Sequence, residues 1–196
     1  MPRVVDIEQR RTELTDATAR VIARSGIEAA TMREIAAEAG WTTGALTHYF
    51  TDKHDLLLAT FQASLAARRS RRADRVARSA IDRLRASLEG ALPLDDDRRR
   101  HWLVTLACCT QASGDEQLAA AQRDAYREFR DYVADLVRES GIAAGEDPVS
   151  AAERLIAIVD GVAVQALFDP QSWPPHRQLA ALAATPTAPT VSLWRR

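Results

Sequence analysis

A run of small and hydrogen-bonding side chains lies between residues 42 and 53 of this 196-residue chain. It carries hydroxyl, imidazole, phenol and ammonium groups, at Thr42, Thr43, Thr47, His48, Tyr49 and Lys53, with Gly44 among them. On an α-helix, positions 43, 44, 47 and 48 share one face. Small residues there would let the helix enter the major groove of DNA, where threonine hydroxyls and methyl groups can contact base edges. The other polar groups can donate hydrogen bonds to phosphates, so these residue types predict recognition of double-stranded DNA.

Two short helices joined by a glycine turn are expected to position this run, over about residues 31–50. Thr31 and Glu34 have the spacing of a capping box, in which the hydroxyl accepts from a backbone N–H and the carboxylate reaches back. Gly40 is expected to end the first helix, because glycine adopts a sharp left-handed turn without steric cost. Arg33, one turn into that helix, is placed to reach a guanine edge or a phosphate. This layout is that of a helix-turn-helix.

Each of these residues, taken singly, also has an ordinary structural explanation. Arg33 and Lys53 can be solvated surface charges, and Thr43 and His48 can be ordinary exposed residues. Tyr49 can be a half-buried aromatic residue of the core. The combination of these residue types at this spacing is what indicates a DNA-reading surface.

Composition and pattern predict an all-α protein. Hydrophobic residues make up 46% of the chain and charged residues 27%, which is ordinary for a soluble globular protein. No alternating runs of Val, Ile and Thr indicate strands. The N-terminus lacks the apolar stretch of a signal peptide, and the longest mostly apolar run, residues 155–168, is too short and too polar, with Asp160, to span a membrane. We therefore expect a cytoplasmic protein with no membrane partner.

Bulk charge gives little support to DNA binding. The net charge is −1, and residues 1–55 carry seven basic against nine acidic side chains. Non-specific attraction to DNA depends on Lys and Arg that neutralise phosphates. Binding would therefore rest on the placement of a few groups, and a helical interaction module that binds no DNA stays open as an alternative.

The chain carries no pattern that indicates an enzyme. It has no glycine-rich phosphate loop and no nucleophile elbow, and its four histidines are scattered. Cys108 and Cys109 are adjacent on a predicted helix, a spacing that suits neither a disulfide nor a metal site. We expect both to be reduced core residues, and we expect no catalytic residue, no metal and no cofactor.

The helix pattern divides the chain into a head and a body. Residues 1–68 are expected to form the DNA-binding head and residues 69–196 a helical body that starts with a helix over about 73–91, which gives about nine or ten helices in all. A helix over about residues 149–168 is apolar nearly all round, so it must be covered on two sides, one by its own core and the other by a partner. Gly161 in this helix is unfavourable by about 1 kcal/mol relative to Ala, which makes sense where another backbone approaches closely.

The segments TMREIAAEAG, TTGAL and HYF resemble the TetR (tetracycline-repressor-like) family of bacterial transcriptional regulators. The match runs from about residue 8 to about residue 68, and it implies that the second short helix reads the operator. The candidate DNA-binding residues are Thr31, Arg33, Thr42, Thr43, Gly44, Thr47, His48, Tyr49 and Lys53. Trp41 replaces a usual Val of the family and is either a prop for the turn or a contact to the DNA backbone. Thr47 replaces a common aromatic residue, which removes one phosphate contact.

The same resemblance gives expectations for the body. Thr47 and the segment LIAIVDGVAVQALFDP are similar to the betaine-pathway repressor branch of that family. Its members dimerise through their last two long helices, and the candidate dimer residues here are Tyr132, Leu155, Val159, Gly161, Val162 and Ala166. The body of the family holds an inducer pocket, for which the candidates on inward faces are Phe61, Trp102, Cys109, Tyr126, Phe129 and Gln165. Plain core packing is the simpler explanation of each pocket candidate taken singly.

The sequence therefore predicts a homodimeric repressor that binds a pseudo-palindromic operator and is released from it by a small-molecule effector. Repression rather than activation is the majority behaviour of the family that the chain resembles. The identity of the effector, the operator sequence and the target genes do not follow from the sequence.

Overall fold

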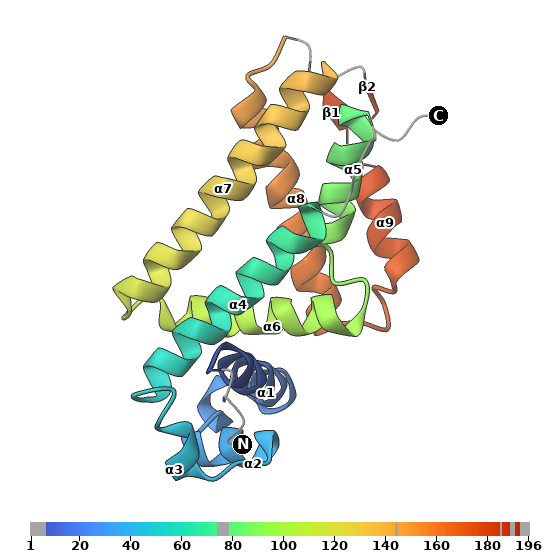
Figure 1. The fold of residues 1–196 in the computed structure, drawn as a ribbon. Helices are drawn as coiled ribbons and strands as arrows, with labels where there is room; N and C mark the ends of the chain where they lie inside the picture. Colours follow the sequence, from blue (N-terminus) through green and yellow to red (C-terminus); the bar gives the residue numbers. More distant parts are fainter. Residues whose placement is uncertain (1–6, 74–78, 144, 185, 189–190, 193–196) are drawn as a thin grey trace. The chain divides into compact units, whose positions relative to one another are not determined.

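The computed structural model describes residues 7–73, 79–143, 145–184, 186–188 and 191–192, and almost all of them are helical (Figure 1). The helices are α1 (Ile7–Ala29), α2 (Met32–Ala39), α3 (Thr43–Leu46), α4 (Lys53–Ala73), α5 (Ala80–Ala91), α6 (Asp96–Gln111), α7 (Glu116–Ser140), α8 (Pro148–Phe168) and α9 (Pro175–Ala183). A short antiparallel hairpin pairs β1 (Pro186–Ala188) with β2 (Val191–Ser192). The predicted all-α class is confirmed, and this hairpin is the only departure from it in the described ranges.

These elements form two compact units. Unit 1 consists of residues 1–67 and 103–122, and unit 2 consists of residues 68–102 and 123–196. The chain passes between the units inside α4, α6 and α7, so each of these helices contributes to both. Unit 1 therefore contains, besides the predicted head, residues 103–122, which the helix pattern had predicted to lie in the body.

In unit 1, α1 and α2 present apolar residues at helical spacing to the interior. Leu14, Ala17 and Val21 of α1 and Ile35 of α2 are all fully buried, as the period of 3.6 residues predicts. α1 bends at Gly26, whose φ of 81° and ψ of 169° lie outside the helical region. Glycine adopts this conformation without steric cost because it has no Cβ.

A polar contact joins the start of α4 to the turn between α6 and α7 within unit 1. Nδ1 of His54 lies 2.8 Å from Oδ2 of Asp115, and its Nε2 lies 3.0 Å from Oε1 of Gln117. The other carboxylate oxygen of Asp115 caps α7 by accepting from the backbone N–H of Gln117. The hydrogen bond with Gln117 raises the pKa of His54 above its ordinary value, and the charges of Asp115, Asp52 and Asp55 raise it further, although burial lowers it.

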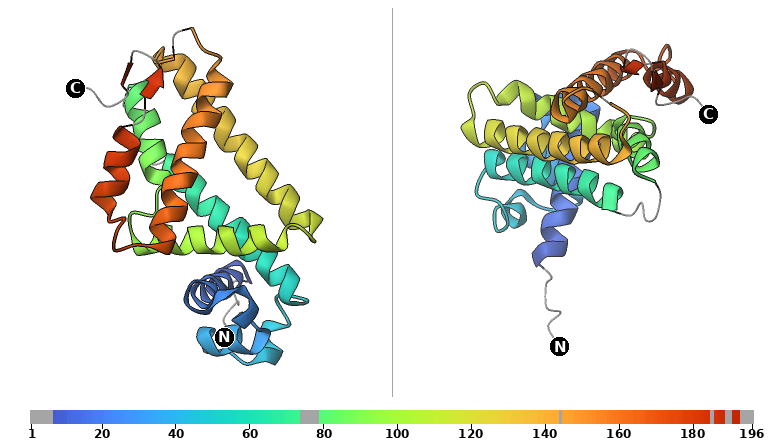
Figure 2. Two further views of the ribbon diagram at one scale, coloured as in Figure 1. Left: turned by 180° about the vertical axis from the view of Figure 1, so that it is seen from behind. Right: turned by 90° about the horizontal axis from the view of Figure 1, so that it is seen from above.

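Unit 2 has an apolar core to which α5, α7, α8 and α9 contribute. Figure 2 shows α8 running between α7 and α9. Leu88, Val133, Val159 and Leu182, one from each of these helices, are at most 1% exposed. Burial of one such side chain stabilises the folded state by about 1.5–3 kcal/mol, so this core determines how the helices of unit 2 pack.

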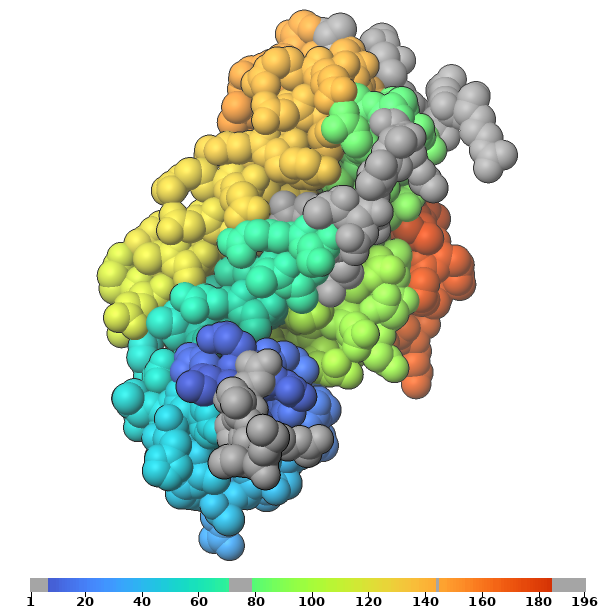
Figure 3. Space-filling view, viewed as in Figure 1, coloured from blue at the N-terminus to red at the C-terminus, as the bar shows by residue number. Residues whose placement is uncertain are grey.

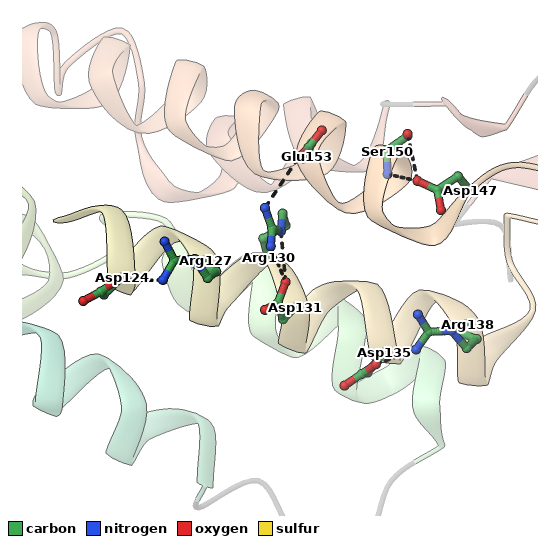
Figure 4. A network of polar contacts seen from close by, with 9 residues as sticks. All are labelled: Asp124, Arg127, Arg130, Asp131, Asp135, Arg138, Asp147, Ser150 and Glu153. Atoms are coloured by element: carbon green, nitrogen blue, oxygen red, sulfur yellow. Dashed lines mark hydrogen bonds and ion pairs between the residues drawn. The ribbon is translucent and has the colours of Figure 1, made fainter. Parts of the chain in front are cut away.

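The solvent face of α7 carries short-range ion pairs (Figure 4). Arg127 pairs with Asp124, three residues earlier. Arg130 pairs with Asp131 and also lies 4.0 Å from a carboxylate oxygen of Glu153 in α8. Exposed pairs of this kind contribute at most about 1 kcal/mol each, so they are a minor term beside the apolar core of unit 2.

The structure corrects the prediction for the two cysteines. Cys108 is buried, and burial raises the pKa of its thiol to about 12, so it is not a thiolate at neutral pH. Cys109 is exposed, so the prediction that it is a core residue is wrong. The physical reason is that neighbouring residues on a helix point about 100° apart, so two adjacent side chains rarely face the same core.

One further finding concerns the start of the body. The helix predicted over 73–91 is described from Ala80 onward as α5, and residues 74–78 of that prediction lie outside the described residues. In the part of the chain that the structure describes, no helix is long and apolar enough to cross a membrane. That same part contains no group of three or more His, Cys, Asp or Glu side chains arranged to hold a metal ion.

Replacing His54 with Gln should lower the melting temperature more at about pH 5.5 than at about pH 8.5. The His54 pKa is raised, so the stabilisation is fully present below the ordinary value of 6.5 and is lost as the pH rises through the folded-state value. Because the side chain is 45% exposed, the effect at low pH should be only about 1–3 °C. Scanning calorimetry measures it, with His176→Gln on the surface of α9 as the control. Equal losses at both pH values would contradict the expected proton linkage.

Candidate nucleic-acid interface

The segment over residues 42–50, here called the recognition segment, contains a single helical turn. α3 spans only Thr43–Leu46, and the hydroxyl of Thr42 caps it by accepting from a backbone N–H at 3.2 Å. Leu46 and Phe50 are at most 1% exposed. A helix this short is not stable by itself in water, so the recognition segment depends on these two buried side chains for its position.

The opposite face of the recognition segment is open to solvent. Thr43, Gly44, Thr47 and His48 are all exposed, as the helical pattern predicted. The hydroxyl of Thr47 donates to the carbonyl oxygen of Gly44 at 2.9 Å, which leaves its oxygen lone pairs for an outside donor. Figure 3 shows the surface of this part of unit 1 in blue and cyan. The face is small and uncharged, and it offers both hydrogen-bonding and methyl groups.

α2, which precedes the recognition segment, shows half of the predicted capping box. The hydroxyl of Thr31 accepts from the backbone N–H of Glu34 at 3.2 Å. The backbone N–H of Thr31 donates to the carbonyl oxygen of Ala29 at 2.8 Å, and the Glu34 carboxylate lies 3.5 Å from the guanidinium of Arg24 instead. Gly40 ends α2 with φ 73° and ψ 27°, the left-handed conformation that was predicted.

Most basic side chains of the head bind other groups of the head. Arg20 and Arg24 donate to the two oxygens of the Glu38 carboxylate, at 2.8 and 2.7 Å. These hydrogen bonds lower the pKa of Glu38. In the described residues of the head, Arg33 is the one basic side chain that makes no hydrogen bond, ion pair or ring contact within the chain. Arg33 is exposed on α2, so its charge is available to a partner.

Lys53, a predicted phosphate contact, has a partner inside unit 1. Its Nζ donates to the backbone carbonyl oxygen of Ile27 at 2.9 Å. This hydrogen bond ties the first residue of α4 to the end of α1. An ammonium group has three N–H donors, so a second partner can still bind to Lys53.

Two arginines of α1 contact the recognition segment and its preceding turn, which the sequence pattern did not predict. Arg11 donates to the carbonyl oxygen of Tyr49 at 2.5 Å, and its guanidinium lies 4.2 Å from the centre of the Phe50 ring. The guanidinium of Arg10 lies 5.3 Å from the centre of the Trp41 ring. The rings of Trp41 and Tyr49 meet edge to face, with 5.4 Å between centroids. Trp41 thus props the turn, and no local signal could have found these contacts because Arg11 and Tyr49 are 38 residues apart.

The residues predicted to line an effector pocket are divided between the two units. Phe61 and Cys109 lie in unit 1, and Trp102, Tyr126, Phe129 and Gln165 lie in unit 2. Phe61, Trp102 and Phe129 are buried, as expected of inward positions. Cys109, Tyr126 and Gln165 are exposed, so the expectation that they point inward is wrong. These three lie beside the buried stripes of their helices rather than within them.

A partly buried carboxylate on α8 lies among aromatic and basic side chains of unit 2. The hydroxyl of Tyr126 donates to the carboxylate of Asp160 at 2.7 Å. Burial raises the pKa of Asp160, although the Tyr126 hydrogen bond and the charge of Arg68 lower it. The guanidinium of Arg68 lies 5.5 Å from the centre of the Phe129 ring. Three helices, α4, α7 and α8, therefore contribute to one polar cluster beside the core of unit 2.

The structure corrects the assignment of faces on α8. Leu155, Val159, Val162 and Ala166, which were predicted to contact a second copy, are at most 7% exposed. Together with the half-buried Tyr132 of α7 they belong to unit 2 itself, so they offer little surface to a partner. The sequence showed that α8 has two apolar sides but could not show which side its own chain covers.

The outer side of α8 carries two small residues, one amide and one aromatic residue at helical spacing. Ala157, Gly161, Gln165 and Phe168 are exposed, and Phe168 is 80% exposed. Apart from the adjoining stretch of α8 itself, no atom of the described residues lies within 4 Å of a Cβ atom built on Gly161. The described part of the chain thus supplies no close backbone approach at Gly161, and the approach of another backbone there stays a prediction.

Comparison with family models matches both parts of the chain. Residues 14–60 match the model described as bacterial regulatory proteins of the tetR family. Residues 80–186 match the model described as the C-terminal part of a BetI-type transcriptional repressor. The first match contains the recognition segment, and the second contains α8 and α9.

Comparison with individual proteins gives relatives that span most of the chain. The regulator PksA of Bacillus subtilis is 33% identical over 87% of this chain and 84% of its own length. The regulator BetI of Vibrio parahaemolyticus is 30% identical over 87% of each chain. A transcriptional regulator from Rhodococcus superposes with a TM-score of 0.80 at 28% identity, covering 88% of this chain and 91% of its own. A transcriptional regulator from Saccharomonospora viridis, solved in complex with choline, superposes with a TM-score of 0.83 at 24% identity. The match covers 89% of this chain and 94% of the other chain, and it shows a similar fold alone.

Proposed function

Because this chain belongs to the TetR family of bacterial transcriptional regulators, with a BetI-type C-terminal part, we propose that it is a homodimeric repressor released from its operator by a small molecule. Its relatives are transcriptional regulators, not enzymes. The observation that carries the proposal is the exposed, uncharged face of Thr43, Gly44, Thr47 and His48. Such a face fits the major groove because nothing bulky or charged opposes close approach to the bases.

The proposed contacts to DNA divide into two kinds. Thr43, Gly44 and Thr47 approach base edges, where hydroxyl and methyl groups can distinguish base pairs. Groups around them position the protein on phosphates; these are Thr31, Arg33, Thr42, His48, Tyr49 and Lys53. The hydroxyl oxygens of Thr31 and Thr42 accept the cap hydrogen bonds, so their O–H groups stay available as donors to phosphate oxygens. Arg33 can instead reach a guanine edge.

The homodimer is proposed to form through the outer side of α8 together with α9. The small side chains of Ala157 and Gly161 would let a second helix approach closely, and Phe168 would become buried on assembly. A two-fold dimer presents two recognition segments, so the operator is expected to be pseudo-palindromic with its half-sites about one helical turn apart. Because such a protein must reach the chromosome, a cytoplasmic location is part of the proposal.

The effector is proposed to bind in unit 2, near the cluster of Tyr126, Phe129 and Asp160. A carboxylate and aromatic rings both favour a positive charge. The guanidinium of Arg68 already lies near the Phe129 ring, so a cationic effector would have to take its place beside Asp160. Choline, the ligand of the Saccharomonospora regulator, is therefore the first probe to test.

The repressor proposal is tested with DNA from upstream of the protein's own gene. At low salt the purified protein should retard this fragment more strongly than a scrambled fragment of the same length and composition, and affinity should fall with rising salt. Addition of choline chloride tests release. If the protein retards neither fragment, the helical interaction module without DNA binding becomes the better explanation.

Replacing Arg33 with Ala should weaken binding to the upstream fragment by about tenfold, since Arg33 is exposed and, among the described residues of the head, is the Lys or Arg side chain with no partner inside the chain. If Arg33 contacts a phosphate, the slope of log affinity against log salt should also fall by about one. If it contacts a guanine, specificity at one base pair should relax instead. Arg20→Ala is the control because Arg20 is already bound to Glu38. Unchanged affinity in Arg33→Ala would remove this residue from the interface.

Replacing Gly161 with Leu should convert the dimer to monomer without unfolding the chain. Near the Cβ of the leucine there is no atom of the described residues outside the local helix, and Leu favours a helix over Gly by up to about 1 kcal/mol. The longer side chain would, however, block a close helix in a second copy. Light scattering gives the mass and circular dichroism the melting curve. Gly114→Leu, where the nearest atom to a Cβ is at 4.0 Å, is the matched control. A dimer mass that persists in Gly161→Leu would refute close approach at this position.

A further inference from the structure

We propose that Arg11 is a positioning residue for DNA recognition, which fixes the recognition segment against α1 through Tyr49 and Phe50 and does not itself contact DNA. The inference rests on the proposed function, since its main consequence is selective binding of the operator. Neither the helical pattern nor the family resemblance assigned a role to this residue.

The recognition segment needs such support at its C-terminal end. α3 has only four residues, and the chain leaves it through backbone hydrogen bonds from Tyr49 and Phe50 to the carbonyl oxygen of Leu46, at 2.9 and 3.2 Å. A carbonyl beyond the end of a helix has no partner within that helix. Arg11 supplies a donor to the carbonyl oxygen of Tyr49, and a charged donor makes a stronger hydrogen bond than a neutral one.

The same guanidinium of Arg11 makes a second contact inside unit 1. Arg11 is partly buried, and its guanidinium lies 4.2 Å from the centre of the Phe50 ring. Phe50 itself is only 1% exposed. A guanidinium at this distance from an aromatic ring is attracted to it. Arg11 thus binds the backbone at one end of the recognition segment and the side chain that anchors it. Arg33, by contrast, is exposed and makes no hydrogen bond, ion pair or ring contact in the part of the chain that the structure describes.

The neighbouring residue of α1 acts on the other flank. The guanidinium of Arg10 lies over the ring of Trp41, and the rings of Trp41 and Tyr49 meet edge to face. Consecutive residues of α1 therefore contact Trp41, just before the recognition segment, and Tyr49 and Phe50 at its end. The position of the segment thus depends on α1 as well as on its own helical turn. Base contacts need placement within a fraction of an ångström, whereas phosphate contacts tolerate more movement. Loss of Arg11 should therefore reduce operator binding more than non-specific binding.

The test compares Arg11→Met with Arg20→Met, since both remove an α1 guanidinium and keep an apolar stem. Affinity is measured by fluorescence anisotropy for the duplex from upstream of the gene and for the scrambled duplex, over a range of salt. Arg11→Met should lose about tenfold or more for the upstream duplex, little for the scrambled one, and none of the salt slope. Arg11→Lys should recover part of the loss, because it keeps one charged donor. Arg20→Met should bind as the unmodified protein does.

Hydrogen exchange on the DNA-free protein gives a second readout that does not depend on the operator. Arg11→Met should speed exchange of the amides in residues 43–50 and leave those of α8 unchanged. A salt slope reduced by about one in Arg11→Met would show a phosphate contact and overturn the proposal. Unchanged exchange over 43–50 would overturn it as well. If the unmodified protein fails to prefer the upstream duplex while exchange in Arg11→Met speeds up, the proposed function fails and the positioning of the segment stands.

Discussion

The recognition segment depends on the burial of Leu46 and Phe50. Its helix is a single turn, and an isolated turn of that length does not persist in water. Each of the two side chains contributes about 1.5–3 kcal/mol by leaving water, which is more than the cap hydrogen bond of Thr42 supplies. The opposite face is then free to carry small polar residues, because the stability of the segment does not depend on them. The burial of Leu46 and Phe50 thus stabilises one face of the segment and leaves the other face available for recognition.

Several basic residues of the head stabilise the head itself. Arg20 and Arg24 hold Glu38, Lys53 holds a carbonyl of α1, and Arg11 holds the end of the recognition segment. The charges of Arg20 and Arg24 are paired with an acidic side chain and so add little to general attraction for DNA, and acidic residues outnumber basic ones over residues 1–55. Such a head should bind non-specific DNA weakly, since that mode depends on neutralised phosphates. Selective binding would then require the two heads of a dimer to act together.

α8 places its two apolar sides against different surroundings. The side with Leu155, Val159 and Val162 is part of the core of unit 2, and the side with Gly161 and Phe168 is open in the single chain. Burial of the core side stabilises the single chain, so this contribution does not depend on protein concentration. The open side gains stability only on association, so a substitution there can change assembly without unfolding the chain. This difference explains why exposure, rather than apolarity alone, identifies the surface proposed for the dimer.

The sequence by itself determined the all-α class, the glycine turn at Gly40, the hydroxyl caps at Thr31 and Thr42, and the outward face of Thr43, Gly44, Thr47 and His48. These features depend on residues a few positions apart, so capping chemistry and the helical period suffice to predict them. The tertiary structure decided what local patterns do not contain. It brought Arg11 to the carbonyl of Tyr49 and Lys53 to the carbonyl of Ile27. It also left Arg33 and Cys109 exposed and buried Leu155 and Val159 in the core. Each of these outcomes depends on contacts between distant parts of the chain, because periodicity shows that a side chain lies on a face but not what covers that face.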